Sequence, residues 1–176
     1  MRRRELLGAA LLLPLEALAQ TCGLITPRQT EGPFFTPNSP QRISFLEGKE
    51  KSRLVLTGTV LSAQCRPVPN ALLDFWHSDE EGAYDNRGFR CRGHQYADAQ
   101  GRYRLETIVP AEYPGRTRHI HVKVQAPGGG ILTTQLYFPG EAGNERDRIF
   151  DSALLLDLQP TDAGRIGRFD FVLDRS

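Results

Sequence analysis

The stretch RHIHVKVQA, residues 118–126, has the alternating character of a β-strand with one apolar face. Residues two apart in a strand point to the same side, so the stretch separates into two sets of side chains. The apolar set consists of Ile120, Val122, Val124 and Ala126 and is expected to face a hydrophobic core. The polar set contains His119 and His121, which therefore project together from the opposite side.

Similar short patterns, separated by turn signals, recur along most of the chain. Strands are also expected at residues 53–62, 71–77, 102–109, 131–138 and 168–174. The last of these, RFDFVLD, alternates strictly and should place its aromatic residues and Leu173 on one face. The only helical pattern, at 145–150, is weak. Short strands at this spacing without long helices predict an all-β fold: a single-domain antiparallel β-sandwich with an irregular N-terminal arm.

The N-terminus, residues 1–19, has the features of an export signal. Arginines at positions 2–4 precede an apolar stretch at 6–15, and the sequence ALA ends at residue 19. The order R-R-x-L-L resembles a twin-arginine signal, which implies export to the periplasm or the outside in a folded state. A lipoprotein signal is the weaker alternative, because the sequence LAQTC lacks a small residue before Cys22.

Length and charge narrow the class further. A chain of 176 residues is expected to form one domain, with residues 20–50 as the N-terminal arm and 51–176 as the sandwich. The net charge of +1 gives no electrostatic basis for binding nucleic acid, so no such partner is expected. Outside the signal no apolar run is long enough to cross a bilayer, so no integral membrane anchor is expected after processing.

The paired histidines, His119 and His121, are candidates for binding a metal ion. The nearby cations Arg116 and Arg118 disfavour protonated rings, whereas a bound metal would keep both imidazoles neutral. A pair of surface histidines without a metal is the plainer alternative. Two histidines leave a metal short of ligands, so further donors must come from elsewhere. The candidates are His77, His94, Asp79, Glu80, Glu81, Asp85 and the loop tyrosines Tyr84 and Tyr113.

The cysteines are interpreted in the light of the export signal. Cys22, Cys65 and Cys91 would lie in a compartment where disulfides persist. Three cysteines allow one bridge and one unpaired thiol, and the sequence leaves the pairing open. We favour Cys65–Cys91, since both flank the candidate site and a bridge would tie two loops together. A cysteine metal site is not expected, because the chain has no C-x-x-C spacing.

Four segments resemble the intradiol ring-cleaving dioxygenases, which open catechols between the two hydroxyls with non-haem Fe(III). TEGPFF (30–35) is similar to a T-E-G-P-aromatic segment of that family, and residues 56–85 to its G-x-V…C-x-P…A…W…G-x-Y block. Residues 98–124 resemble its D-x-x-G-x-Y/F…T-x-x-P-x-x-Y-P…R-x-x-H-I-H core, and TTQLYFPGE (133–141) its T-Q-L-Y-F segment. The resemblance implies an antiparallel β-sandwich and fits the small exported branch.

Residue by residue, the resemblance implies an iron site with four protein ligands. Tyr84 and Tyr113 match the two tyrosinate ligands, and Tyr113 matches the one that leaves the metal when substrate arrives. His119 and His121 match the two histidine ligands. Hard phenolate oxygens favour the ferric state, so Fe(3+) is the implied cofactor and no organic cofactor is needed.

The same resemblance implies roles around the substrate. Arg116 matches the arginine that steadies negative charge on the substrate, and it is the expected catalytic residue together with Tyr113. Gln135 matches a polar residue lining the pocket. The implied reaction converts a catechol-type substrate and O2 to a cis,cis-muconate-type product. The spacing from Tyr113 to His119 is shorter than in the large cytoplasmic members, so one wall of the pocket is expected to differ.

Two alternatives come from other classes of protein. A cupin-like Fe(II) or Mn enzyme also uses H-x-H on a strand but needs a later histidine, which this chain lacks. A non-catalytic, transthyretin-like sandwich binding small aromatics or a protein partner would need no metal. Trp76, Tyr103 and Tyr137 lie in strand patterns and are expected mainly to pack. The sequence leaves open which catechol is used, the oligomeric state and whether the signal is removed.

Overall fold

The computed structural model describes residues 23–48, 50 and 52–174. This part of the chain forms strands and one short 3-10 helix, and none of its helices is long and apolar enough to span a bilayer. The strands are β1 (Arg53–Ser62), β2 (Leu72–Trp76), β3 (Arg92–Tyr96), β4 (Arg102–Ile108), β5 (His119–Gln125), β6 (Ile131–Tyr137), β7 (Asp157–Thr161), β8 (Gly164–Arg168) and β9 (Phe171–Leu173). The expected export signal, 1–19, lies outside the described residues, and the division of the chain at residues 19 and 50 stays a prediction.

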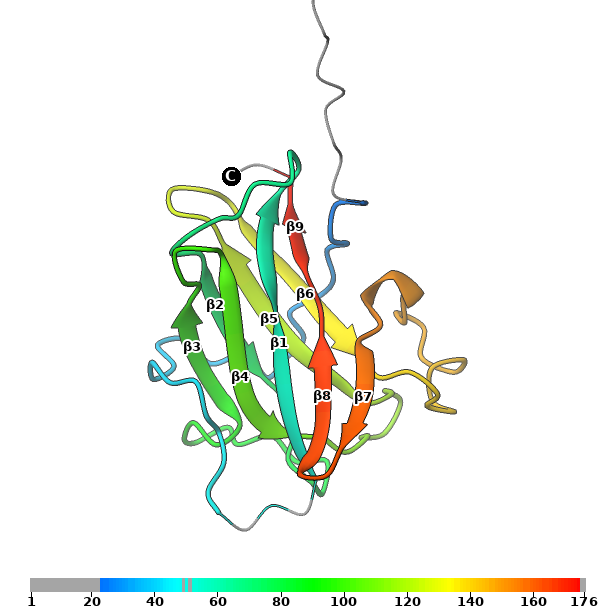
Figure 1. Cartoon of the computed structure of the whole chain (residues 1–176). Helices are drawn as coiled ribbons and strands as arrows, with labels where there is room; N and C mark the ends of the chain where they lie inside the picture. Colours follow the sequence, from blue (N-terminus) through cyan, green and yellow to red (C-terminus); the bar gives the residue numbers. More distant parts are fainter. Residues whose placement is uncertain (1–22, 49, 51, 175–176) are drawn as a thin grey trace, which may run out of the picture.

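The strands form two sheets that lie face to face (Figure 1). One sheet has the order β4-β1-β8-β7, with β9 paired to a further part of β1, and the other has the order β3-β2-β5-β6. The all-β sandwich is thus confirmed. The second sheet is antiparallel throughout, whereas β1 pairs in parallel with both β8 and β9. Hydrophobic alternation does not encode strand direction, so these parallel pairs could not be predicted from it.

The hydrophobic core lies between the two sheets. β5 contributes Ile120, Val122 and Val124, each 0% exposed, as its alternation predicts. The same cluster includes Leu54 and Leu105 from the other sheet. Each such side chain stabilises the fold by about 1.5–3 kcal/mol when it is buried. This packing fixes the rotation of β5, so the histidine side of the strand faces away from the core.

The strand expected at 168–174 is interrupted between β8 and β9. At the interruption the backbone N–H of Thr59 in β1 donates to the Asp170 side chain (2.8 Å) instead of to a backbone carbonyl. Gly58 lies opposite, where an added Cβ would be 1.8 Å from the carbonyl oxygen of Phe169. Only glycine permits the two backbones to approach so closely. The expected inward face of this segment is confirmed, whereas its continuity is not.

Residues 23–48 cross the outer face of the second sheet before β1 begins. Near the start, Thr26 N–H donates to the Val172 carbonyl (3.0 Å), and Val172 N–H donates to the Thr26 hydroxyl (2.8 Å). Gln29 N–H then donates to a carbonyl of the edge strand β6 (2.8 Å). At the far end, Phe45 N–H donates to a carbonyl of β4 (2.8 Å). The segment is therefore anchored to β9, β6 and β4, and it covers the side of β5 that carries the histidines.

Two local expectations are wrong. Residues 145–150 form turns, and the helix of the described chain is the 3-10 helix at Ser152–Leu154. Cys91 is free and buried while Cys65 is disulfide-bonded, so the favoured Cys65–Cys91 bridge does not exist. Cys65 precedes the start of β2 and Cys91 lies beside its end, and this five-residue strand spans about 16 Å. A disulfide needs Cα atoms within about 7 Å of each other.

Candidate metal centre

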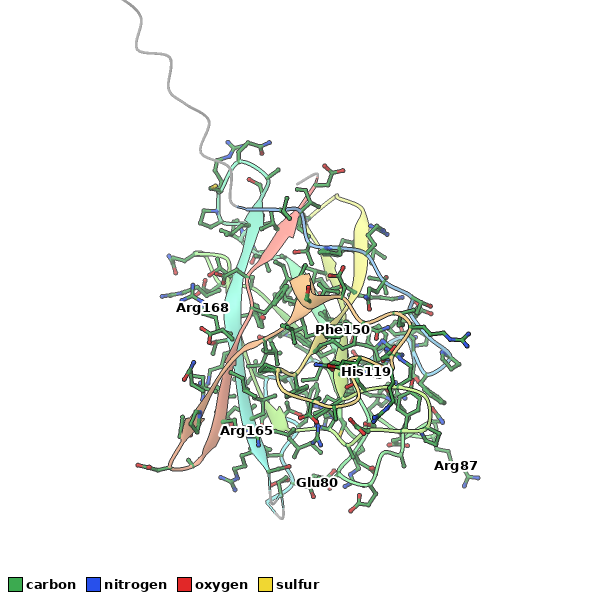
Figure 2. The ribbon with its side chains drawn as sticks, turned by 90° about the vertical axis from the view of Figure 1, so that its right-hand side faces the viewer. Glu80, Arg87, His119, Phe150, Arg165 and Arg168 are labelled. Carbon is green, nitrogen blue, oxygen red and sulfur yellow. The ribbon has the colours of Figure 1, made fainter. Side chains whose placement is uncertain are left out.

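His119 and His121 lie on the outer side of β5 and are nevertheless buried, with 2% and 1% of their surfaces exposed. The sheet register places Trp76 of β2 and Gln135 of β6 on either side of His121, and Tyr137 beside His119. In Figure 2 the labelled His119 lies well within the outline of the molecule, whereas the labelled Arg87 projects at its edge. The polar face expected from alternation is present, but the N-terminal arm and two loops shield it from solvent.

The two imidazoles direct their Nε2 atoms toward each other, 3.1 Å apart. His119 Nδ1 lies 2.6 Å from the Thr117 carbonyl oxygen, and a carbonyl only accepts, so Nδ1 carries the proton. His119 Nε2 therefore presents a lone pair, as in metal-bound histidines whose other nitrogen is fixed by a backbone carbonyl. The His121 ring stacks on Trp76, with centroids 4.8 Å apart and planes inclined by 6°. His121 Nδ1 is buried and has no hydrogen-bond partner within the described chain.

Tyr84 reaches the histidines from the loop between β2 and β3. Carboxylates shape this loop: Asp79 Oδ1 accepts two backbone N–H groups (3.0 and 2.9 Å), and Asp85 accepts three. The hydrogen bonds from the backbone lower the pKa of Asp85 to about 2, so it stays ionised and holds the turn at neutral pH. Tyr84 Oη then lies 3.5 Å from His119 Nε2.

Tyr113 and Arg116 are the two ends of a Tyr-Pro-Gly-Arg turn. Arg116 N–H donates to the Tyr113 carbonyl (3.0 Å), and Gly115 has a φ of 83°. Proline second and a positive-φ glycine third are typical of a type II turn. The turn brings the two side chains together, with Arg116 Nη1 3.4 Å from Tyr113 Oη. The Tyr113 ring centroid is 5.6 Å from that of His119 and 5.7 Å from that of Tyr84.

The structure thus brings together the four side chains expected to bind iron. Within the described residues, His, Cys, Asp and Glu side chains form no group of three or more that could hold a metal ion. The side-chain donors that lie beside the two imidazoles here are the phenol oxygens. The Nε2–Nε2 separation of 3.1 Å and the Oη–Nε2 separation of 3.5 Å suit neighbouring donors around one ion, for bonds of about 2.1 Å. Phenol oxygens with imidazole nitrogens form a hard donor set that fits Fe(III).

Burial shifts the protonation of these groups. Desolvation, together with the nearby charge of Arg116, lowers the pKa of His119 to about 4. Desolvation, with the neighbouring His119, also lowers the pKa of His121 well below its usual value. Burial raises the pKa of Tyr84, and the proximity of Tyr113 adds to the effect. Both imidazoles are therefore neutral and ready to bind a metal near pH 7, whereas Tyr84 must first release its proton.

The guanidinium of Arg116 is held on several sides. Its Nε lies 2.9 Å from Asp147 Oδ2, and the same carboxylate oxygen accepts the backbone N–H of Thr117 (3.0 Å). Its Nη2 donates to Gln135 Oε1 and lies 3.4 Å from Tyr137 Oη. The two residues expected to contact substrate, Arg116 and Gln135, are thus adjacent to each other. Both lie beside Tyr137, and Arg116 also lies beside Tyr113.

The TEGPFF segment, 30–35, covers the outer side of the site. Gly32 has a φ of 71° and lies against His121, where an added Cβ would be 3.4 Å from the ring atom Cε1. Phe34 stacks on Tyr84, with centroids 4.4 Å apart and planes inclined by 16°. This sequence motif is therefore a structural part of the candidate site.

Two clefts reach the tyrosines from the loop side of the molecule. One has a volume of about 470 Å³, and its walls include Tyr113, Arg116 and Asp147. The other has a volume of about 250 Å³, and its walls include Tyr84 and Cys91. Each of the two tyrosines is therefore one of the residues that line a cleft.

The remaining polar candidates have other partners. His77 Nε2 lies 2.7 Å from the Thr107 hydroxyl, and His94 Nδ1 lies 2.7 Å from the Ser39 carbonyl. Arg118 pairs with a glutamate (3.2 Å) and donates to a backbone carbonyl (3.0 Å). These interactions stabilise strands and loops around the candidate centre and do not place the candidate donors His77 and His94 among its ligands.

Three residues at the site were not expected from the sequence to act there. Tyr137 carried a signal, because it lies two residues after Gln135 on a strand and so shares its face. Trp76 was expected mainly to pack; it lies on His121 because of the β2–β5 register, which a single strand pattern does not reveal. Asp147 lies in the polar run mistaken for a weak helix, and no periodicity marked it.

Comparison with known proteins identifies the family. The family model described as dioxygenase matches residues 30–175. The catechol 1,2-dioxygenase of Acinetobacter baylyi is 30% identical over 146 residues, which cover 66% of this chain and 47% of that protein. The chlorocatechol 1,2-dioxygenase of Pseudomonas sp. strain P51 is 29% identical over 174 residues, 83% of this chain and 69% of that protein. The chain spans about half the length of the first curated relatives it matches (47% and 58%).

The fold comparison agrees. The dioxygenase domain of a dioxygenase carbohydrate-binding protein fusion from Streptomyces sp. SirexAA-E is 53% identical with a TM-score of 0.84, covering 86% of this chain and 99% of that one. Catechol 1,2-dioxygenase from Pseudomonas arvilla C-1 is 26% identical with a TM-score of 0.77, covering 86% of this chain and 62% of that one. With a family model that matches nearly all of the described sandwich, this chain belongs to the intradiol dioxygenase family of oxidoreductases.

Proposed function

We propose that this chain is a non-haem Fe(III) dioxygenase that cleaves catechol-type rings between their two hydroxyls with O2, giving cis,cis-muconate-type products. The observation that carries the proposal is the convergence of two phenols and two neutral imidazoles, from one strand and two loops, in a buried site. Relatives named catechol, chlorocatechol and hydroxyquinol 1,2-dioxygenases support this class of reaction.

The proposed ligands are Tyr84, Tyr113, His119 and His121. When bound, Fe(III) would take up the oxygens of the deprotonated catechol and make the ring reactive toward O2. The chain's own contribution is the donor set, since two anionic phenolates favour the ferric over the ferrous state. Burial of the imidazoles keeps them neutral, so the site needs no deprotonation of imidazolium before it binds the ion.

Two side chains are proposed to act on the substrate, and Gln135 is proposed to line its pocket. A catechol must lose both hydroxyl protons. The Oη atom of Tyr113, a residue in the wall of the 470 Å³ cleft, is the proposed acceptor for one of them. The guanidinium of Arg116, 3.4 Å from that oxygen, would stabilise negative charge that develops on the ring. Gln135 holds the guanidinium through its Oε1 atom, while its Nε2 donates to the Thr30 carbonyl (3.0 Å). Preorganised charge of this kind is effective because the site is shielded from water.

The absorption spectrum of iron-loaded protein tests the proposal directly. Phenolate–Fe(III) charge transfer should colour the protein, anaerobic addition of catechol should shift the band, and admission of O2 should consume one O2 per catechol. Tyr84→Phe and Tyr113→Phe should each change the spectrum. Tyr103→Phe is the matched control, because Tyr103 Oη donates to the Phe169 carbonyl (2.8 Å) in the core. A colourless protein that binds an aromatic without consuming O2 would instead support a transthyretin-like binding role.

We also propose that the protein is exported by the twin-arginine route. The disulfide at Cys65 supports an oxidising destination, because such bonds rarely persist in the cytosol. Fractionation of cells producing the wild type and a variant with Arg3→Lys and Arg4→Lys tests the route. Retention of the variant in the cytoplasm is expected, and equal export of both proteins would contradict a twin-arginine signal.

A further inference from the structure

We propose that Asp147 is a positioning residue for the ring-cleavage reaction: its buried carboxylate holds the Arg116 guanidinium beside Tyr113 without itself touching substrate. This inference rests on the proposed function, because it explains what orients Arg116, a residue of the proposed reaction. Asp147 lies outside the four sequence segments that resemble the family, and no periodic pattern marks it.

The carboxylate of Asp147 is itself fixed by the backbone. Its Oδ1 accepts the N–H of Ile149 (3.1 Å), and its Oδ2 accepts the N–H of Thr117 (3.0 Å) together with Arg116 Nε (2.9 Å). The Asp147 side chain is 1% exposed and that of Arg116 is 16% exposed, so water screens the pair only weakly. The carboxylate is thus oriented by two groups that do not depend on the arginine.

The position of Asp147 determines where the rest of the guanidinium points. A guanidinium is planar, so fixing Nε on one carboxylate leaves its two outer nitrogens in defined directions. Nη1 then faces Tyr113 Oη at 3.4 Å, and Nη2 faces Gln135 and Tyr137 on β6. In the part of the chain that the structure describes, Asp147 is the one carboxylate in ion-pair contact with Arg116. Without it, a mostly buried cation would have no counter-charge and would turn toward solvent.

A purely structural role is the alternative, because Asp147 also ties its loop to the Tyr113 turn through Thr117. A second tie joins the same two segments without touching Arg116. The Thr117 hydroxyl donates to Asn144 Oδ1 (2.8 Å), and Asn144 Nδ2 donates to the Phe138 carbonyl (2.9 Å). Asn144→Ala therefore loosens the same loop while leaving the ion pair in place, which makes it the matched control for Asp147→Asn.

The first test is kinetic and uses the iron-loaded protein with catechol. Asp147→Asn should lower kcat by about tenfold or more, short of the 10²–10³-fold effect of deleting a charge-stabilising donor. The KM for catechol and the visible spectrum of the substrate-free enzyme should change little, and Asp147→Glu should restore part of kcat. In an Arg116→Gln background, Asp147→Asn should cause no further loss, because the two residues act as one unit. Two results would overturn the proposal. One is a further loss of kcat when Asp147→Asn is added to Arg116→Gln, and the other is a fall in kcat for Asn144→Ala equal to that for Asp147→Asn.

The second test needs no turnover and uses the metal-free protein. In the wild type the Arg116 Nε–H should exchange slowly with solvent and give an observable ¹⁵N–¹H resonance, assigned by its absence in Arg116→Gln. Asp147→Asn should abolish the resonance, whereas Asn144→Ala should keep it. Retention in Asp147→Asn would show that the carboxylate does not hold the guanidinium. If the iron-loaded wild type failed to cleave any catechol, the proposed function would fail, while this measurement would still decide whether Asp147 orients Arg116.

Discussion

Replacing Tyr84 with phenylalanine should reduce by one the number of protons that the protein releases when it binds iron, and so weaken the dependence of its iron affinity on pH. Burial raises the pKa of Tyr84, so the metal-free protein keeps this phenol protonated through the neutral range. If Tyr84 binds iron as a phenolate, each binding event releases that proton. The proton of Tyr84 alone then contributes a factor of ten in iron affinity, about 1.36 kcal/mol, for each unit by which the pH rises. From pH 6 to pH 8 the wild type should gain about 100-fold in affinity relative to Tyr84→Phe.

The variant should fold normally, so the effect on iron is separable from stability. Phenylalanine preserves the ring that stacks on Phe34 at 4.4 Å. The substitution removes the interaction of Tyr84 Oη with His119 Nε2, which at 3.5 Å is at the long limit for a hydrogen bond. The free energy of unfolding of the metal-free variant should therefore lie within about 1 kcal/mol of the wild type.

Competition with a chelator measures the iron affinity of each protein across the pH range. The protonation of the chelator affects all proteins equally and cancels when they are compared. Tyr103→Phe, which removes a hydroxyl from the core, should follow the wild-type slope. Parallel slopes for the wild type and Tyr84→Phe would show that Tyr84 does not bind iron as a phenolate, and the four-ligand assignment would have to be abandoned.

Three further predictions concern acid stability, crowding at the site and the free thiol. Burial lowers the pKa of His77 from 6.5 to about 4, so the stabilising contribution of this residue is present above pH 6.5 and is lost in acid. Denaturant titrations between pH 7 and pH 4 should show that the free energy of unfolding of the metal-free wild type falls by about 3 kcal/mol more than that of His77→Gln. Equal losses in the two proteins would refute this prediction. Gly32→Val and Gly128→Val both place a side chain at a residue with a positive φ, a strain of about 1–2 kcal/mol. Only Gly32→Val places atoms against the His121 ring, so only this variant should weaken iron binding. An equal effect of the two substitutions on iron affinity would contradict this prediction. Burial raises the pKa of the Cys91 thiol to about 11, so a thiol reagent should leave the native protein unlabelled. After denaturation without reductant, the reagent should label one thiol per chain. Labelling of three thiols would contradict the disulfide at Cys65.

Alternation along single strands predicted a large part of the fold. The expected β1, 53–62, matches the observed bounds, and the core face of β5 was correct residue by residue, because burying one side of a strand requires an apolar residue at every second position. The same reasoning placed His119 and His121 side by side. Proline and glycine in the YPGR turn, 113–116, likewise carry enough stereochemical information to place Tyr113 against Arg116.

The remaining features depend on contacts between distant parts of the chain, which local periodicity does not report. The arm covers the histidine face through backbone hydrogen bonds to β6, β4 and β9, so a strand face that looked polar is buried. The interruption between β8 and β9 depends on Gly58, more than a hundred residues earlier. Asp147 meets Arg116 across 31 positions of sequence, and its loop has no repeating pattern from which the contact could be inferred.

The N-terminal arm works as a strap fastened at both ends, by Thr26 to β9 and by Phe45 to β4. A segment attached at one end can rotate about a hinge to admit a ligand, whereas a segment anchored at both ends can move only in its middle part. Access to the site would therefore depend on the two loops that carry Tyr84 and Tyr113, each of which lines a cleft. The size of the ligand that the protein accepts would then be set by the length and shape of those two tyrosine-bearing loops. Lengthening the N-terminal arm would do little to increase the size of ligand accepted.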